Sequence, residues 1–277
     1  VADEGFTIAN TMGELNYAMQ LKASQVIIHY YMGELIRARE GVEEILPELH
    51  AMNLDWWVFA MLTTVGQTAF DLGDLTTCIR IAETIGSFDS NALAAGWGGC
   101  FKRYLWGEIL SLLGYLDEAE VLLRENLEVK TEKFIEWLSR LSLAKVDLRR
   151  GKYRECRQVL ENILEEAQTR GFEVIAQGAK LELLRAALEQ SNERNLEVEW
   201  KKYAPDLTHS QLLGIKISFT TLDGQRLALQ RKSEKAKVML QTAYEEASTA
   251  KYVWESLSAL EELIALGYDR EESIKSG

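Results

Sequence analysis

The pattern that decides the fold is clearest in Gly114-Tyr-Leu-Asp-Glu-Ala119, and it recurs as Gly33-Glu-Leu-Ile-Arg-Ala38, Gly73-Asp-Leu-Thr-Thr-Cys78 and Gly151-Lys-Tyr-Arg-Glu-Cys156. Each copy follows an apolar helix end and has a small residue five positions after the glycine. Glycine ends the first helix because its missing Cβ tolerates the left-handed cap conformation. The small residue lets two antiparallel helices approach closely. Each copy therefore predicts a helical hairpin.

Weaker copies continue the series at Arg231-Lys-Ser-Glu-Lys-Ala236 and Gly267-Tyr-Asp-Arg-Glu-Glu272, and a further turn is expected between Gln190 and Glu193. Successive turns lie about forty residues apart, which is typical of stacked helical hairpins and not of a heptad coiled coil. Proline occurs only at Pro47 and Pro205, and good helix formers are abundant. The sequence therefore predicts an all-α fold.

The repeat is expected to fill a single domain, residues 1–277. The chain begins with Val1 and not with Met, so we expect it to be a fragment of a larger multidomain protein. Polar residues before apolar runs predict helix N-caps at Asp55, Ser90 or Asn91, Thr131 and Thr208. The predicted units are 10–50, 55–88, 91–128, 131–168, 171–204, 208–249 and 251–277.

A small residue also stands seven positions before three of the turn glycines, at Gly66, Gly107 and Ala144. With the turn pattern, these residues resemble the tetratricopeptide (TPR) repeat family over nearly the whole chain. The resemblance implies a right-handed superhelix of about seven hairpins, whose first helices line a concave groove. The units are longer than the roughly thirty-four residues usual in that family, and the proline that commonly closes a unit is absent.

Units of this length are similar to the MalT-like repeat regions of bacterial signalling ATPases, kinases and regulators. The late stretch Ala250-Lys-Tyr-Val-Trp-Glu-Ser-Leu-Ser-Ala-Leu-Glu-Glu-Leu263 resembles late repeats of those proteins. In them the repeat array senses or transmits a signal. The resemblance implies that this chain is a regulatory module in signal transduction.

Charge and composition restrict the classes of partner and the cellular location that we expect for this chain. The formal net charge is -12, and this negative field disfavours direct binding of nucleic acid. The richest basic stretch, Leu148 to Arg157, is interrupted by Glu155. Three distant cysteines do not indicate a disulfide framework, and no apolar run is long enough to cross a membrane. A cytoplasmic location without membrane insertion is expected.

We find no pattern typical of a catalytic, metal or cofactor site. The three histidines lack the spacing of a metal site, and His29 is expected to pack on a first helix or to face the groove. Cys78 and Cys156 fill the small-residue position of their turns. The run Ala95-Gly-Trp-Gly-Gly-Cys100 lacks the strand and the Lys-Ser or Lys-Thr of a phosphate loop. It predicts the start of a closely packed helix, with close approach of a ligand to its backbone as the alternative.

The sequence therefore predicts a non-catalytic interaction and sensor module that binds a protein or peptide segment, or a small regulatory ligand, in its groove. The alternative is a structural spacer or oligomerisation scaffold attached to a catalytic ATPase, kinase or cyclase domain, with a homodimer as one form. Flanking domains of the parent protein would be further partners. The predicted groove positions, counted back from the turns, are Thr63, Gln67, Phe70, Tyr104, Glu108, Ser111, Leu141, Lys145, Arg149, Lys180, Thr221 and Gln225.

Overall fold

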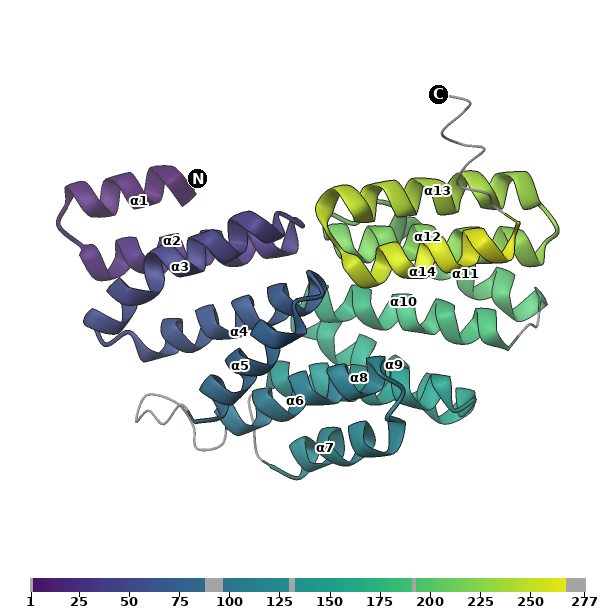
Figure 1. Ribbon diagram of the computed structural model, residues 1–277, viewed down its shortest axis with the longest axis horizontal. Helices are drawn as coiled ribbons and strands as arrows, with labels where there is room; N and C mark the ends of the chain where they lie inside the picture. Colours follow the sequence, from purple (N-terminus) through teal and green to yellow (C-terminus); the bar gives the residue numbers. More distant parts are fainter. Residues whose placement is uncertain (1, 88–96, 130–132, 191–192, 268–277) are drawn as a thin grey trace. The chain divides into compact units, whose positions relative to one another are not determined.

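A computed structural model describes residues 2–87, 97–129, 133–190 and 193–267, and these residues form helices and no strand (Figure 1). The all-α prediction is confirmed. The chain divides into two compact units, Val1–Gly151 and Lys152–Gly277, which we describe separately.

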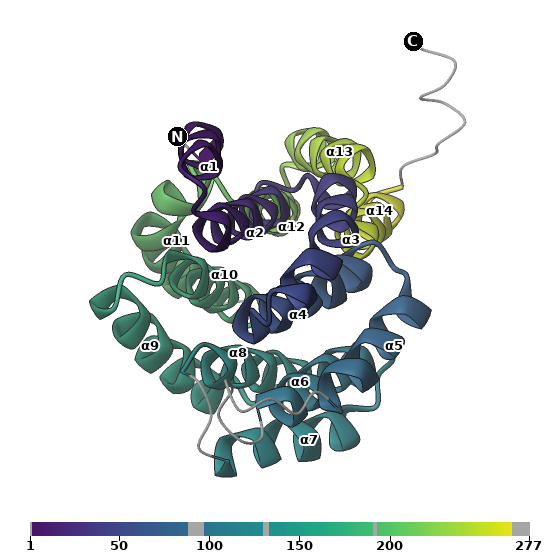
Figure 2. The same cartoon turned by 90° about the vertical axis from the view of Figure 1, so that its left-hand side faces the viewer.

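Unit 1 is a succession of helices in which each helix packs against the next along the chain. In addition, α2 contacts α4, α4 contacts α6 and α6 contacts α8, and we call these four the inner helices of unit 1. The others pack mainly against their sequence neighbours, and Figure 2 shows α3, α5 and α7 to one side of the inner row. The helices are α1 (Ala2–Thr11), α2 (Leu15–Tyr31), α3 (Leu35–Ala51), α4 (Asp55–Asp71), α5 (Leu75–Gly86), α6 (Trp97–Leu112), α7 (Leu116–Glu128) and α8 (Lys133–Arg149).

Unit 2 repeats this scheme. Neighbouring helices pack in sequence order, and α10 contacts α12, which contacts α14, so these three are its inner helices. Packing between neighbours, with every second helix in contact, is consistent with a helical repeat. The helices are α9 (Tyr153–Thr169), α10 (Glu173–Glu189), α11 (Glu193–Thr208), α12 (Leu213–Leu229), α13 (Ser233–Ala250) and α14 (Val253–Ala265).

The predicted turns at Gly33, Gly73, Gly114, Gly151 and Arg231 lie between helices, and the glycines among them have left-handed backbone angles. Part of the turn predicted between Gln190 and Glu193, and the residues that follow Gly267, lie outside the described residues. The φ angles of Gly33, Gly73, Gly114 and Gly151 are 80°, 73°, 88° and 73°. At the copy without glycine, Arg231 itself adopts a φ of 58°. A non-glycine residue pays a steric cost there, so the turn geometry is kept even where the sequence no longer favours it.

Every described small residue of the pattern is fully buried between helices. The residues five positions after the turn residue have no exposed surface, and they are Ala38, Cys78, Ala119, Cys156 and Ala236. The position seven before the turn is equally tight, because a Cβ built on Gly107 would lie 2.7 Å from Leu123 Cγ of the facing helix α7. The predicted role of the small residue after the turn in close helix packing is confirmed for these residues, and the structure shows a similarly close approach at Gly107.

The predicted N-caps fare less well. Thr208 was expected to cap the next helix, but it lies in the last turn of α11, where its hydroxyl donates to the Ala204 carbonyl. The prediction is wrong because a threonine satisfies its hydroxyl as well at a helix end as at a helix start. Asp55 is the first residue of α4, whose cap is Leu54. The predictions at Ser90, Asn91 and Thr131 lie outside the described residues.

Among the described residues, no helix combines the length and apolar character that crossing a membrane requires.

Candidate functional site

The predicted groove positions all lie on inner helices of the two units. Those on α4, α6 and α8 belong to unit 1, and those on α10 and α12 belong to unit 2. Their exposure is mixed. Five are buried (Tyr104, Ser111, Leu141, Lys180 and Thr221), six are half-buried (Thr63, Gln67, Phe70, Glu108, Lys145 and Gln225) and Arg149 is exposed.

In unit 1, several of these positions contact one another across successive inner helices. Lys145 Nζ on α8 lies 3.3 Å from Glu108 Oε2 on α6. The Arg149 guanidinium donates to the Ser111 carbonyl. Each pair joins residues separated by about one repeat, so equivalent places on neighbouring inner helices meet. These polar groups therefore tie α6 to α8 and are not free to bind a ligand without exchanging partners.

The predicted positions in unit 2 also have partners, but none of them contacts another predicted position through the following bonds. Gln225 Nε2 on α12 donates to Glu262 Oε1 on α14 at 2.8 Å. Lys180 Nζ on α10 lies 2.7 Å from Asp206 Oδ2 on α11. The Thr221 hydroxyl donates to the Ile217 carbonyl of its own helix at 3.2 Å. The structure thus gives each of these groups a partner inside unit 2.

A cavity of about 150 Å³ lies between the four inner helices of unit 1, and we call it the aromatic pocket. Only Thr63 and Gln67 among the predicted groove positions line it. Its lining comes from α2 (Ile27, Tyr30, Tyr31), α4 (Trp56, Phe59, Ala60, Thr63, Thr64, Gln67), α6 (Trp97, Phe101) and α8 (Phe134, Ile135).

The rings of α4 and α6 form the best-defined wall of the aromatic pocket. Trp56 and Trp97 meet at 72° with centroids 5.3 Å apart, and Phe59 and Phe101 meet at 74° with centroids 6.2 Å apart. Phe101 is 1% exposed and Phe59 is 4% exposed, whereas Trp56 is 44% exposed. Trp56 therefore stands at the rim, and the two phenylalanines form the floor.

The polar groups of the aromatic pocket are uncharged. Thr63 and Thr64 both donate their hydroxyl hydrogens to the Ala60 carbonyl at 2.8 Å. Burial raises the pKa of Tyr31 to about 12, so its phenol stays neutral at physiological pH. No Asp, Glu, Lys, Arg or His is among the lining residues that the structure describes. A bound group would thus meet aromatic rings and neutral polar groups there.

A buried polar network lies next to two residues that line the pocket, Phe101 and Ile135. Asn126 on α7 is fully buried, and its Nδ2 donates to the Cys100 carbonyl at 2.8 Å and to Ser139 Oγ at 3.0 Å. Its Oδ1 accepts from Arg103 Nε at 2.8 Å. One amide therefore joins α6, α7 and α8, beside the turn of α8 whose Ile135 lines the pocket.

The basic stretch around the boundary of the two units is engaged in ion pairs. Arg150 pairs with Asp117 and Glu120 in unit 1. Arg157 pairs with Glu161 and with a buried carboxylate, Glu199, in unit 2. These arginines hold helices together.

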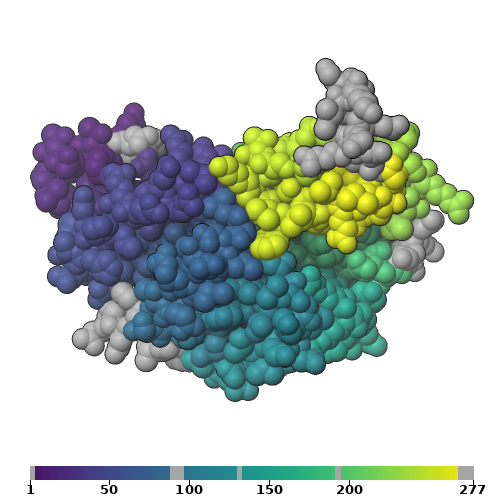
Figure 3. All heavy atoms as spheres, viewed as in Figure 1, coloured from purple at the N-terminus to yellow at the C-terminus, as the bar shows by residue number. Residues whose placement is uncertain are grey.

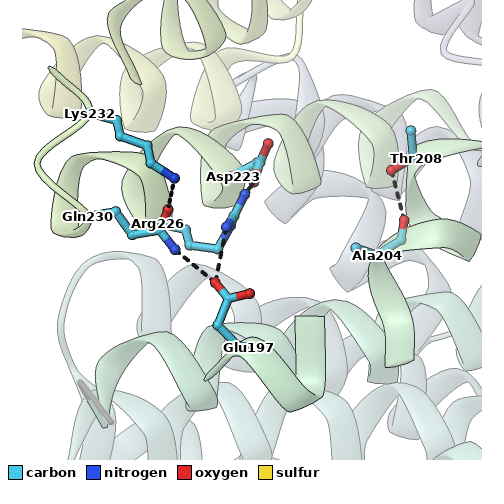
Figure 4. A network of polar contacts seen from close by, with 7 residues as sticks. All are labelled: Glu197, Ala204, Thr208, Asp223, Arg226, Gln230 and Lys232. Atoms are coloured by element: carbon cyan, nitrogen blue, oxygen red, sulfur yellow. Dashed lines mark hydrogen bonds and ion pairs between the residues drawn. The ribbon is translucent and has the colours of Figure 1, made fainter. Parts of the chain in front are cut away.

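A second polar cluster in unit 2 has the same structural role. Arg226 Nη2 lies 2.7 Å from Asp223 Oδ1 and its Nη1 lies 3.3 Å from Glu197 Oε1, with Gln230 donating to the same Glu197 oxygen at 2.8 Å (Figure 4). The guanidinium also lies 4.8 Å from the centroid of the Trp200 ring. Stacking and paired charges together fix α12 against α11.

His29 has a polar partner, and the side chains of Cys78 and Cys100 are buried. His29 Nδ1 lies 2.5 Å from Glu34 Oε2. Burial, and then the nearby charges of Asp71 and Asp74, raise the pKa of the Cys78 thiol to about 12. In the part of the chain that the structure describes, no group of three His, Cys, Asp or Glu side chains is placed to hold a metal ion. Cys100 is buried at the start of α6, as expected for a closely packed helix, whereas Ala95 of the same run lies outside the described residues.

No model of a known protein family matches the chain. A search of curated proteins gives no match either.

Proposed function

We propose that this chain is a non-catalytic interaction and sensor module, and that the aromatic pocket of unit 1 is where its ligand or partner is anchored. The observation that supports this most is the pocket itself, an aromatic cavity of about 150 Å³ between four helices that come from separate repeats. Apolar cavities with a few placed polar groups are the usual binding sites of ligands. Lys145 and Arg149, farther along the inner row, would contact the rest of a longer partner.

The finer parts of the proposal follow the repeat pattern. We infer a right-handed superhelix of about seven tetratricopeptide-like hairpins, and a signalling or transcription-regulatory role in the cytoplasm. The buried small residues at the turns and the contacts between every second helix support the repeat. A module of this kind would report binding by changing how neighbouring hairpins stack.

A ligand screen that follows thermal stability and tryptophan fluorescence tests the anchoring role. The library contains peptides and small metabolites, and each hit is measured again with Trp56→Ala and with Lys145→Glu. We expect hits to lose affinity when the rim ring is removed, and longer partners to lose affinity when the charge is reversed. Hits that ignore both substitutions would rule out this site.

An alternative function, a scaffold that dimerises or docks on a neighbouring domain, is supported by a different observation. Apolar side chains are exposed at the α1–α2 turn, where α1 lies at the surface in purple (Figure 3). They are Ile8, Met12, Leu15 and Tyr17, of which Met12 is 73% exposed. Exposed apolar clusters commonly mark interfaces. Light scattering across concentrations separates the two functions, because a monomer at every concentration would exclude self-association.

A further inference from the structure

The chemistry of the aromatic pocket restricts its ligand more narrowly than the proposed function does. Seven of its lining side chains are aromatic, and ring faces carry partial negative charge. Among the described residues, the lining contains no basic side chain to neutralise an anion, and the whole chain has a formal net charge of -12. A phosphate or carboxylate would be repelled by this field and would find only neutral donors such as the Gln67 amide. The described lining therefore disfavours anionic ligands.

The two threonines make the pocket a site for hydrogen-bond donors or positive charge. A hydroxyl has one donor and two acceptor lone pairs. Thr63 and Thr64 both use their donor on the Ala60 carbonyl. What these two oxygens offer to a bound group is acceptor capacity alone, so polarised N–H or C–H groups fit beside them.

The type of cation follows from the described part of the lining, which contains no carboxylate. A primary ammonium carries three strong donors, and its loss of hydration needs charged or numerous acceptors. A trimethylammonium group has no N–H, spreads its charge over methyl groups and is weakly hydrated. Ring faces suit such a group, and its polarised methyl hydrogens suit the threonine oxygens.

Size and ring geometry agree with this choice. A cavity of about 150 Å³ accepts a group of benzene size, and a trimethylammonium group is no larger. The pairs Trp56–Trp97 and Phe59–Phe101 each meet near a right angle, so the wall between α4 and α6 forms corners that surround a compact group from more than one direction.

We propose that the aromatic pocket binds a trimethylammonium group through cation–π contacts with Trp56 and its neighbouring rings and through contacts with the Thr63 and Thr64 oxygens. This inference rests on the proposed function, because it names the ligand class of the same site. The same head group occurs on free quaternary amines and on trimethylated lysine side chains, and the experiment below separates the two sources.

The test compares choline with 3,3-dimethylbutan-1-ol, which has the same shape with carbon in place of the charged nitrogen. Binding to the full chain is measured by isothermal titration calorimetry and by tryptophan fluorescence. Cation–π attraction corresponds to a preference for choline of about threefold to thirtyfold. A peptide with trimethyllysine, against the same peptide with unmodified lysine, tests the protein-borne source, and a preference for the methylated form supports the same head group.

Substitutions locate the effect. Trp56→Ala is expected to abolish the preference for choline, whereas Trp56→Phe keeps a ring and retains part of it. Thr63→Val keeps the shape but removes the oxygen, so it should weaken choline binding and leave the neutral alcohol unaffected. Tyr115→Ala removes a ring outside the pocket that is 55% exposed, against 44% for Trp56, and should change neither affinity. Circular dichroism confirms that each variant is folded.

The possible outcomes distinguish a failure of the trimethylammonium inference from a failure of the proposed binding function of the pocket. If the neutral alcohol binds as tightly as choline and Trp56→Ala weakens both, the pocket is a binding site for neutral apolar groups and the trimethylammonium inference is wrong. If neither choline nor the methylated peptide binds, the inference is also wrong, and the ligand screen with Trp56→Ala then decides whether the pocket binds anything. Choline binding that Trp56→Ala leaves unchanged would overturn both.

Discussion

The substitution Gly107→Ala tests the helix packing on which the repeat depends. In a helix interior this change normally stabilises by about 1 kcal/mol, because alanine restricts the unfolded chain and favours the helix. At Gly107, however, the added Cβ would lie 2.7 Å from Leu123 Cγ and 2.8 Å from Leu123 Cδ2. Leu123 is fully buried and has no room to move. Forcing a methyl group into such a core costs about 1–3 kcal/mol.

Gly99 on the same helix provides a matched control. Its added Cβ would meet only Arg103 Nη1, at an ordinary 3.6 Å, so Gly99→Ala should gain up to about 1 kcal/mol. The difference between the two variants isolates the packing cost. Thermal and urea unfolding, followed by circular dichroism, should place Gly107→Ala several degrees below Gly99→Ala, since each kcal/mol shifts the midpoint by about 2–4 °C for a chain of this size.

A double-mutant cycle identifies the clashing atom. Leu123→Ala alone should cost about 2–5 kcal/mol through the cavity that it leaves. In that background Gly107→Ala should become neutral or stabilising, because the leucine side chain that it would strike is gone. If Gly107→Ala stabilises the wild-type chain as much as Gly99→Ala does, the close approach of α6 and α7 is refuted. An additive double mutant would show that Leu123 is not the obstacle.

Three further predictions concern single contacts. The side chain of Asp74 accepts from the Thr77 amide at 3.0 Å, which lowers the carboxyl pKa; Asp74→Ala should therefore cost about 0.5–2 kcal/mol at neutral pH. This difference should shrink as the pH falls below the ordinary Asp value of 3.8 and through the lower pKa of the folded chain, because the stability from a lowered pKa is lost when the carboxyl is protonated. Asn126→Ala should cost about 2–3 kcal/mol in urea unfolding by leaving buried polar groups unpaired, and a cost below about 0.5 kcal/mol would contradict the network. All three cysteines are buried, so a colorimetric thiol reagent should modify none of them in the native chain and all three in denaturant; rapid modification of the native chain would disprove the burial.

The sequence predicts the turns well because their requirements are local. A left-handed cap favours glycine, and two helices in close contact need a small residue at a fixed distance from the turn, so both signals appear in a short window. The signal fails where another residue takes over the geometry. Gly224 stands seven positions before Arg231, and its Cβ would lie 2.6 Å from Leu240 Cγ. The sequence pattern includes this weaker copy, Arg231 to Ala236, but not its small residue Gly224, because the position seven residues before the turn was counted only from turn glycines.

The first hairpin shows why the distance from the turn is not sufficient to predict where the small residue lies. Here the residue seven before the turn is Val26, and the small residue is Gly41 on the facing helix α3, whose Cβ would lie 2.7 Å from Val26 Cγ2. The close approach of the two helices is kept while the large and the small side chain exchange sides. Packing restricts the combined volume of the two side chains that face each other, and not the volume of each side chain separately. A pattern of residue types at fixed sequence positions does not reveal such an exchange between two facing helices.

The repeat pattern does not predict the aromatic pocket, because the pocket also depends on how side chains from several helices pack together. Thr63 and Gln67, two of the groove positions predicted by counting back from the turn glycines, line the pocket. The rings that form its wall and floor lie elsewhere in the register, such as Trp56 at the start of α4 and Trp97 at the start of α6. Aromatic side chains at helical spacing predict core as readily as a cavity. What distinguishes this site is that rings from different repeats leave about 150 Å³ unfilled between them. That volume depends on how four helices meet and not on the turns, so a regular turn pattern carries no information about it, and an otherwise regular array can acquire a specific ligand at such a place.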